Sequence, residues 1–231
     1  MAVKVNLGCG PVGKDDWVNL DWGILAFLHR YRAIETFLLK FNLFPKGYNI
    51  KWPKNLRLFN CRRKLPFTAD SVDYIYASHF LEHFKKFEAE RILKDCYRVL
   101  KTGGVIRIAV PDLELLVRKY LEKDRGYFKK LYALMNFGEE GEIQDDLQLA
   151  DVVMDNFYPR FYRSEPSGIN RLMVYFVRPH FWMYDWESLA SLARSAGFSD
   201  IQRRAFRGGD VPDSSSLDVF PEISLYLEAK K

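Results

Sequence analysis

The stretch VKVNLGCGPVGKDDWVNLD at residues 3–21 decides the fold. Its apolar run at residues 3–7 is typical of a β-strand, and the run ends at the turn Gly8-Cys9-Gly10. Glycines at such a turn let the backbone bend tightly and come close to a ligand. A second strand is predicted at residues 17–21. The segment between these strands is too short for a full crossover helix, so we expect a loop to join them.

Further strands and helices alternate along the rest of the chain. Apolar runs predict additional strands at residues 56–61, 72–77, 105–110, 201–206 and 223–229. Helical spacing is predicted at residues 24–44, 87–101, most of 113–135, and 185–196. Gly103 is expected to cap the second of these helices in a left-handed conformation. This alternation favours an α/β fold with a doubly wound, mostly parallel sheet of the seven-stranded type and helical insertions.

The composition excludes several classes of protein. The chain has 231 residues, 48% of them hydrophobic, which favours a single globular domain and excludes general disorder. No run approaches the roughly 18 apolar residues of a membrane-spanning helix, and the first ten residues lack the pattern of a signal peptide. Three widely spaced cysteines (Cys9, Cys61 and Cys96) indicate reduced thiols in a cytoplasmic protein, with neither a disulfide framework nor a zinc site.

Charged and aromatic residues are concentrated in two segments. The net charge is +5, but residues 22–64 hold ten Lys/Arg and one acid, so this segment carries +9 and the rest of the chain −4. Fourteen aromatic residues fall within residues 127–186. We expect a basic helical insertion at residues 22–55 and an aromatic-rich insertion at residues 127–184. Together they would form a lid and acceptor region for an anionic, sugar-bearing or amphipathic small molecule.

The glycines Gly8, Gly10 and Gly13 also spell G-x-G-x-x-G, the fingerprint of dinucleotide-binding folds. That fingerprint needs a helix after the glycines and an acid about 20 residues further on. Here Pro11 interrupts the helix and Asp21 comes too early. An NAD-dependent oxidoreductase is therefore a weaker alternative. Asp21, at the end of the second strand, is well placed to accept hydrogen bonds from ribose hydroxyls.

Three segments in this order carry a family resemblance: VNLGCGPVGKDDWVNLD at residues 5–21, LPFTADSVDYIYASHFLEHF at 65–84, and RVLKTGGVIRIAVPDLE at 98–114. Together they resemble class I S-adenosylmethionine-dependent methyltransferases, in particular small type-11 methyltransferase-like enzymes connected with glycan synthesis. The resemblance resumes at residues 179–198. It implies one Rossmann-like methyltransferase domain over residues 1–231, with S-adenosyl-L-methionine as cofactor and S-adenosyl-L-homocysteine as product.

The resemblance also assigns cofactor contacts residue by residue. It places the methionine part of the cofactor against the backbone of Leu7, Gly8, Cys9 and Gly10. Asp21 matches the acid on the ribose, and Ser78 and His79 match the cleft edge after the fourth strand. Asn60 stands where the family usually has an Asp that accepts from the adenine amino group, with Cys61 and Arg62 flanking the adenine. An Asn oxygen still accepts a hydrogen bond, but the neutral residue differs from the family pattern.

General-base candidates for a hydroxyl acceptor are few. His79 abuts the predicted cleft, and an imidazole titrates near neutral pH; the alternative is a residue that only positions its neighbours. His180, in the aromatic run HFWMY, is the second candidate, and the alternative there is a buried, satisfied histidine. Glu82 and His83 are expected to pack or cap locally. No metal is required, because a positively charged sulfur is already a good leaving group.

The predicted activity is in-line methyl transfer to a small-molecule or glycan-related acceptor. Methyltransferases acting on base amines usually carry Asn/Asp-Pro-Pro-aromatic after the fourth strand, where this chain reads ASHFLEH, so nucleic acid is disfavoured as a partner. A non-catalytic S-adenosylmethionine-binding protein or a membrane-surface accessory protein is the alternative. Residues 24–44 either contact a membrane peripherally or form a cap helix buried on the sheet. The oligomeric state is left open.

Overall fold

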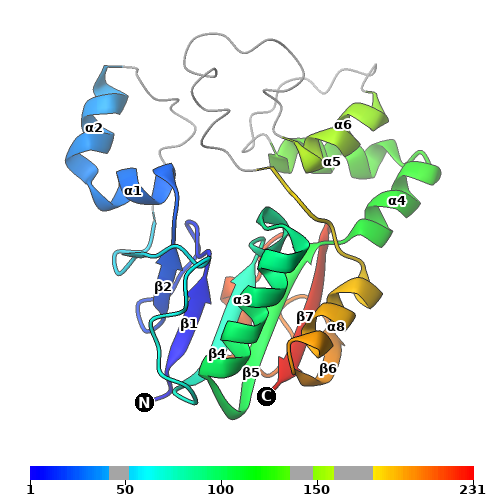
Figure 1. Cartoon of the computed structure of the whole chain (residues 1–231). Coiled ribbons are helices and arrows are strands. Elements are labelled where there is room, and N and C mark those ends of the chain that lie inside the picture. Colours follow the sequence, from blue (N-terminus) through cyan, green and yellow to red (C-terminus); the bar gives the residue numbers. More distant parts are fainter. Residues whose placement is uncertain (42–51, 136–147, 159–178) are drawn as a thin grey trace.

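Seven strands form one sheet in the order β3-β2-β1-β4-β5-β7-β6 (Figure 1). The computed structural model describes residues 1–41, 52–135, 148–158 and 179–231. Strands β1 to β5 pair in parallel, whereas β7 pairs antiparallel with both β5 and β6, which confirms the mostly parallel sheet. The strands are β1 (Lys4–Leu7), β2 (Val18–Asp21), β3 (Arg57–Leu58), β4 (Val72–Ser78), β5 (Leu100–Pro111), β6 (Ser199–Arg204) and β7 (Ser224–Lys230).

Helices α3 (Lys86–Val99) and α8 (Trp186–Ser195) cover one face of the sheet (Figure 1). Their apolar faces enter the main core together with alternate residues of the central strands, such as Ile75 and Ile106. The intervening residues Tyr76 and Val105 point to the opposite face, where they pack with Trp17, Val211 and Leu217. The short helix α9 (Ser214–Leu217) contributes to that second cluster.

The predicted helix at residues 24–44 is two helices where the structure describes it. Helix α1 (Ile24–Arg30) ends at Tyr31, and α2 (Arg32–Lys40) follows directly. In α1, Ala26 packs in a small cluster with Cys9 and Leu56, whereas most of α2 is exposed. The buried-cap alternative therefore holds for α1 and fails for α2. Residues 42–44 lie outside the described residues.

The prediction that Gly103 caps the helix before it is wrong. Gly103 does have a left-handed backbone, with φ +78°, but α3 already ends at Val99 and Gly103 lies within β5. The reason is that Leu100 is fully buried and pairs with Val72, so the chain enters the sheet immediately after the helix. The backbone N–H of Gly103 donates to the carbonyl of Lys231.

The predicted helical region at residues 113–135 is divided into α4 (Leu113–Leu121) and α5 (Arg125–Met135). They pack with α6 (Leu149–Phe157) around Leu116, Phe128 and Val152 in a cluster separate from the main core. Figure 1 shows α5 and α6, like α1 and α2, beyond the edge where the parallel strands end. None of the described helices is long and apolar enough to cross a membrane. Residues 136–147 and 159–178 of the predicted aromatic-rich insertion lie outside the described residues.

Candidate active site

The turn after β1 has the backbone conformation that its glycines predict. Gly8 and Gly10 have φ of +63° and +50°, and the backbone N–H groups of Gly8 and Cys9 donate to the carbonyl of Leu20 at 2.8 and 3.2 Å. A Cβ on Gly8 would lie 2.3 Å from Phe80 Cδ2, whereas a Cβ on Gly10 would meet no described atom within 4 Å. The turn is therefore packed on one side and open beside Gly10, where a ligand can approach the backbone.

Asp21 closes this turn from the end of β2. Its Oδ2 accepts from the N–H of Gly10 at 2.8 Å, and its Oδ1 accepts from the N–H of Trp22 at 2.6 Å. Burial raises the pKa of this carboxyl, and these two hydrogen bonds oppose that effect. Each carboxylate oxygen keeps a further lone pair that can accept a hydrogen bond from a hydroxyl. A carboxylate held beside an open glycine turn fits the ribose-bearing cofactor that the sequence implies.

No helix follows the glycines. Residues 8–17, all of them described, form turns and bends that lead directly into β2. The dinucleotide fingerprint requires a helix there, whose N-terminus binds the pyrophosphate. The NAD alternative therefore lacks its binding element.

The predicted adenine region lies after β3. The Oδ1 of Asn60 accepts from the N–H of Arg62 at 3.0 Å, so the amide oxygen expected to contact adenine already holds a local turn. The guanidinium of Arg62 pairs with Glu88 at 2.7 Å and lies 4.6 Å from the ring of Phe84. Cys61 is buried in the main core, and burial raises the pKa of its thiol to about 12. The adenine contacts of these residues stay a prediction.

The other predicted residues meet at the same edge. Leu7 ends β1 and pairs with Ala77, so Ser78, the last residue of β4, lies beside the glycine turn. The carboxyl end of β2 is joined to the chain after β3 by a hydrogen bond from Phe59 N–H to Asp21 O at 2.8 Å. Because parallel strands end at one edge, the structure gathers the ends of β1, β2 and β4 at the same edge of the sheet, where ligands of such sheets bind.

His79 follows β4 in a strained conformation. Its φ is +47°, which is uncommon for a residue with a side chain. Its Nε2 lies 2.9 Å from Ser224 Oγ, and its Nδ1 lies 3.4 Å from Glu82 Oε1. The ring packs edge to face against Phe220, with centroids 5.0 Å apart. Both ring nitrogens are thus engaged by side chains, an arrangement suited to orienting Glu82.

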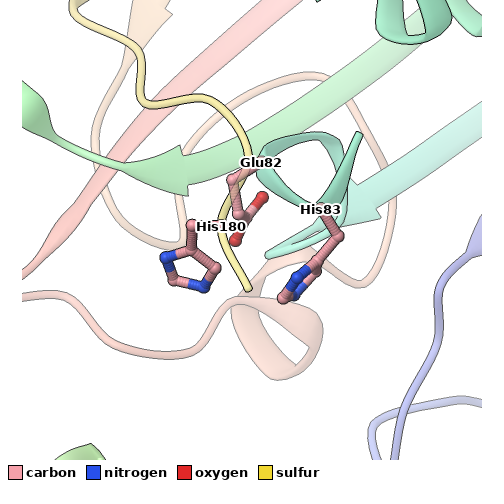
Figure 2. Close-up of side chains that lie close together, drawn as sticks. All are labelled: Glu82, His83 and His180. Atoms are coloured by element: carbon pink, nitrogen blue, oxygen red, sulfur yellow. The ribbon is translucent and has the colours of Figure 1, made fainter. Parts of the chain in front are cut away.

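Glu82, His83 and His180 form a compact cluster beside His79. Figure 2 shows the Glu82 carboxylate near both imidazole rings. One ligand-type atom from each of the three residues lies within 4.8 Å of the others. Glu82 and His83 belong to the 3-10 turn η2 (Leu81–His83). The backbone carbonyl of Glu82 accepts from Phe181 N–H at 2.7 Å, and this hydrogen bond holds the segment that carries His180 against η2.

The electrostatics of the cluster are unusual for a buried site. Burial by itself would raise the pKa of the Glu82 carboxyl, but the nearby imidazole of His79, followed by those of His83 and His180, lowers it to about 2. Burial lowers the pKa of His180 to about 4. Glu82 is therefore a carboxylate and His180 a neutral imidazole near neutral pH.

Sequence reasoning placed Glu82 and His83 outside the site, as local packing or capping residues. The structure brings both to its centre, together with His79 and His180. The available signal was the spacing H-x-x-E-H at residues 79–83, which gathers three polar side chains over little more than one turn. Asp112, by contrast, is the N-cap of α4, because its Oδ1 accepts from Leu115 N–H at 3.1 Å.

A protein-family model matches part of the chain. Residues 47–108 match the family model for a methyltransferase domain. No curated protein matches the chain significantly.

Solved methyltransferase structures are similar to the chain. One is an S-adenosylmethionine-dependent methyltransferase, possible histamine N-methyltransferase, from Thermotoga maritima (14% identity, 100% of this chain and 83% of that one, TM-score 0.46). A second is an S-adenosylmethionine-dependent methyltransferase from Archaeoglobus fulgidus (15% identity, 100% of this chain and 86% of that one, TM-score 0.49). A third, also an S-adenosylmethionine-dependent methyltransferase, is from Methanosarcina mazei (16% identity, 99% of this chain and 91% of that one, TM-score 0.49).

The matched segment runs from before β3 into β5 and includes Asn60, Ser78 and His79. The glycine turn and Asp21 precede it and lie at the same strand-end edge of the sheet. When bound there, S-adenosylmethionine supplies a methyl group on a positively charged sulfur. Over residues 47–108 the chain is similar to the methyltransferase-domain family, in agreement with the resemblance of its sequence to class I S-adenosylmethionine-dependent methyltransferases.

Proposed function

We propose that the methyl acceptor is a small molecule related to glycans, bound beside the cluster at the strand-end edge. The observation that carries this proposal is a set of aromatic rings around the cluster. Phe181 and Trp182 directly follow His180 and are 45% and 41% exposed, and Phe220, which packs on His79, is 36% exposed. Binding sites for organic ligands are lined mainly by apolar and aromatic groups with a few polar ones. Flat rings of this kind can cover the C–H faces of a sugar.

The basic helices α1 and α2 support an anionic acceptor. They lie beyond the edge of the sheet where the parallel strands end (Figure 1). Arg30, Arg32 and Lys40 are all exposed on them, and the only acid in the two helices is Glu35. A positive surface near the crevice raises the local concentration of an anionic substrate, such as a phosphate-linked sugar.

The same helices also support peripheral contact with a membrane. Phe27 and Tyr31 at α1, and Ile34, Phe37 and Phe41 at α2, are 42–56% exposed and recur every three or four residues along each helix. An exposed apolar stripe flanked by basic residues is typical of a helix that lies in the interface of an anionic membrane. This observation favours a lipid-linked acceptor for the enzyme. We place the protein in the cytoplasm, a location supported by its three buried free thiols.

The acceptor class is testable with labelled cofactor. The full chain would be incubated with methyl-labelled S-adenosylmethionine and with free sugars, nucleotide sugars, lipid-linked glycans and sugar-free metabolites, and products would be identified by mass spectrometry. We expect the label in a sugar-bearing, anionic acceptor, with one S-adenosylhomocysteine formed per methyl group.

Asp21→Ala serves as the control that lacks the ribose contact, and we expect it to form no labelled product. Transfer only to sugar-free metabolites would contradict the glycan assignment. Cofactor binding without transfer to any acceptor would favour the non-catalytic alternative.

A further inference from the structure

The carboxylate of Glu82 is the least satisfied polar group of the site. Its side chain is fully buried, and neither Oε1 nor Oε2 has a hydrogen-bond partner among the described residues. The imidazole of His79, 3.4 Å away, is the one ion-pair partner recorded for it in the described part of the chain. Burying a charged carboxylate without strong partners is costly, so such groups are normally paired or coordinate a metal.

The two histidines of the cluster present free nitrogen lone pairs to this carboxylate. His83 Nδ1 lies 3.3 Å from the carbonyl oxygen of Pro179, which can only accept, so Nδ1 carries the proton and Nε2 is left bare. His180 Nδ1 is buried and has no hydrogen-bond partner among the described residues, while the ring bonds the backbone of Asn156. Histidines that ligate metals donate their other N–H to a carbonyl or carboxylate in this way.

We infer that Glu82, His83 and His180 bind one divalent first-row transition-metal ion. Two imidazoles and one carboxylate suit Zn²⁺, Fe²⁺, Co²⁺ or Mn²⁺ and disfavour Ca²⁺ and Mg²⁺, which prefer all-oxygen ligands. The ligand atoms, within 4.8 Å of one another, need only small side-chain rotations to reach a common ion at about 2.0–2.2 Å. His79, held by Ser224, orients Glu82 from outside the ligand set.

Three protein ligands leave at least one position of the ion open. In such sites the open position takes water or a substrate oxygen, and the ion favours the ionised form of a hydroxyl. The cluster lies close to the cofactor turn, because Phe80, between His79 and Leu81, packs against Gly8. It also borders the exposed rings of Phe181 and Trp182. This part of the inference rests on the proposed function: the ion holds a hydroxyl or carboxylate oxygen of the acceptor.

Metal binding can be measured without any methyl acceptor. The full chain would be stripped with a chelator, dialysed and titrated with Zn²⁺ and Mn²⁺ by calorimetry and with Co²⁺ by visible absorption. We expect one ion per chain and a Co²⁺ spectrum of nitrogen and oxygen ligands. Because loss of an outer-shell partner already costs about 10–100-fold in affinity, Glu82→Gln and His83→Gln should each weaken binding at least that much.

His29→Gln is the matched control, since it removes an imidazole that stacks on Trp52, away from the cluster. It should bind the ion as the wild type does. Binding of S-adenosylhomocysteine shows that each variant is folded. If Glu82→Gln does not fold, the half-buried His83 decides the test. The inference is overturned if the wild type binds no ion at about 1 mM metal, or if the folded ligand variants bind it unchanged.

The role of the ion in methyl transfer can be tested separately from its binding. With an acceptor in hand, chelation should lower the transfer rate and added Mn²⁺ or Zn²⁺ should restore it. Stoichiometric ion binding without transfer to any sugar would refute the proposed acceptor and leave the metal site standing. Transfer that proceeds equally in chelated protein would refute the role assigned to the ion.

Discussion

At the scale of single residues, the site depends on two glycines whose surroundings differ. Gly8 and Gly10 both adopt left-handed backbone conformations after β1. Only Gly8 is also packed against a neighbour, the buried ring of Phe80, which belongs to the segment that carries the cluster. A change at Gly8 therefore acts on the cofactor turn and on the cluster together.

We expect Gly8→Ala to destabilise the protein by about 1–3 kcal/mol and to weaken S-adenosylhomocysteine binding. The left-handed backbone disfavours a Cβ, and that Cβ would lie 2.3 Å from Phe80 Cδ2. Denaturant unfolding and calorimetry measure the two effects. Gly103→Ala is the control, because Gly103 has φ +78° and no described atom near its Cβ position. It should lose stability and keep its affinity; unchanged affinity in Gly8→Ala would refute the role of the turn.

At the scale of elements, α1 and α2 differ in how much of their surface is buried. Helix α1 buries Ala26 and Leu28 and so anchors the basic insertion beside β3. Helix α2 buries little, and Ile34, Phe37 and Phe41 form an exposed apolar stripe along it. An amphipathic pattern alone does not distinguish a helix that packs on the sheet from one that faces outward.

The stripe predicts binding to anionic vesicles. We expect the full chain to cosediment with phosphatidylcholine vesicles that contain phosphatidylglycerol, and much less with phosphatidylcholine alone, because both apolar burial and charge contribute. The double variant Phe37→Ser and Phe41→Ser should bind at least about tenfold more weakly, since the two rings are 55% and 56% exposed.

Phe87→Ser is the matched control for this experiment. Phe87 is 67% exposed but belongs to α3, outside the stripe, so its loss should leave vesicle binding unchanged. Equal loss in both variants would indicate a general effect of surface hydrophobicity. A wild-type chain that stays in the supernatant with both vesicles would refute the membrane contact.

At the scale of the whole molecule, a buried ion network ties the end of the chain to the sheet. Arg107, at the centre of β5, is fully buried and pairs with Asp218 at 2.5 Å and with Glu228 at 3.0 Å. Its remaining donors reach the carbonyls of Gly208 and Ala205 at 2.6 and 3.0 Å. One guanidinium thus donates hydrogen bonds to acceptors on β7 and in the loop that precedes β7.

Arg107→Met should destabilise the protein by about 3–5 kcal/mol, because Asp218 and Glu228 would be left buried without their partner. Denaturant unfolding gives the free energy of unfolding. The control is Lys94→Ala, which breaks an exposed pair with Glu90 one helical turn away and should cost about 0.5 kcal/mol or less. A cost for Arg107→Met similar to that control would show that the network adds little.

The sequence by itself determined the sheet and the cofactor side of the site. Short apolar strands, the glycine turn and Asp21 are local patterns, and parallel strands bring their ends to one edge whatever the details of packing. The N-caps at Asp112 and Asp185 are local in the same sense, because each side chain accepts from a backbone N–H of its own helix. The break at Tyr31 was missed, and so was the start of β5 at Leu100, which depends on burial and on pairing with the distant residue Val72.

Only the tertiary structure showed that Glu82, His83 and His180 form a cluster. His180 lies about 100 positions from Glu82 in the sequence, and the two meet because the carbonyl of Glu82 accepts hydrogen bonds from the backbone N–H groups of Phe181 and Trp182. Whether a glutamate is a capping residue or a buried, unpaired carboxylate depends on what covers it, and that is a property of packing across the fold. Local sequence therefore predicts where the cofactor binds, and long-range contacts specify the cluster of Glu82, His83 and His180 near that turn.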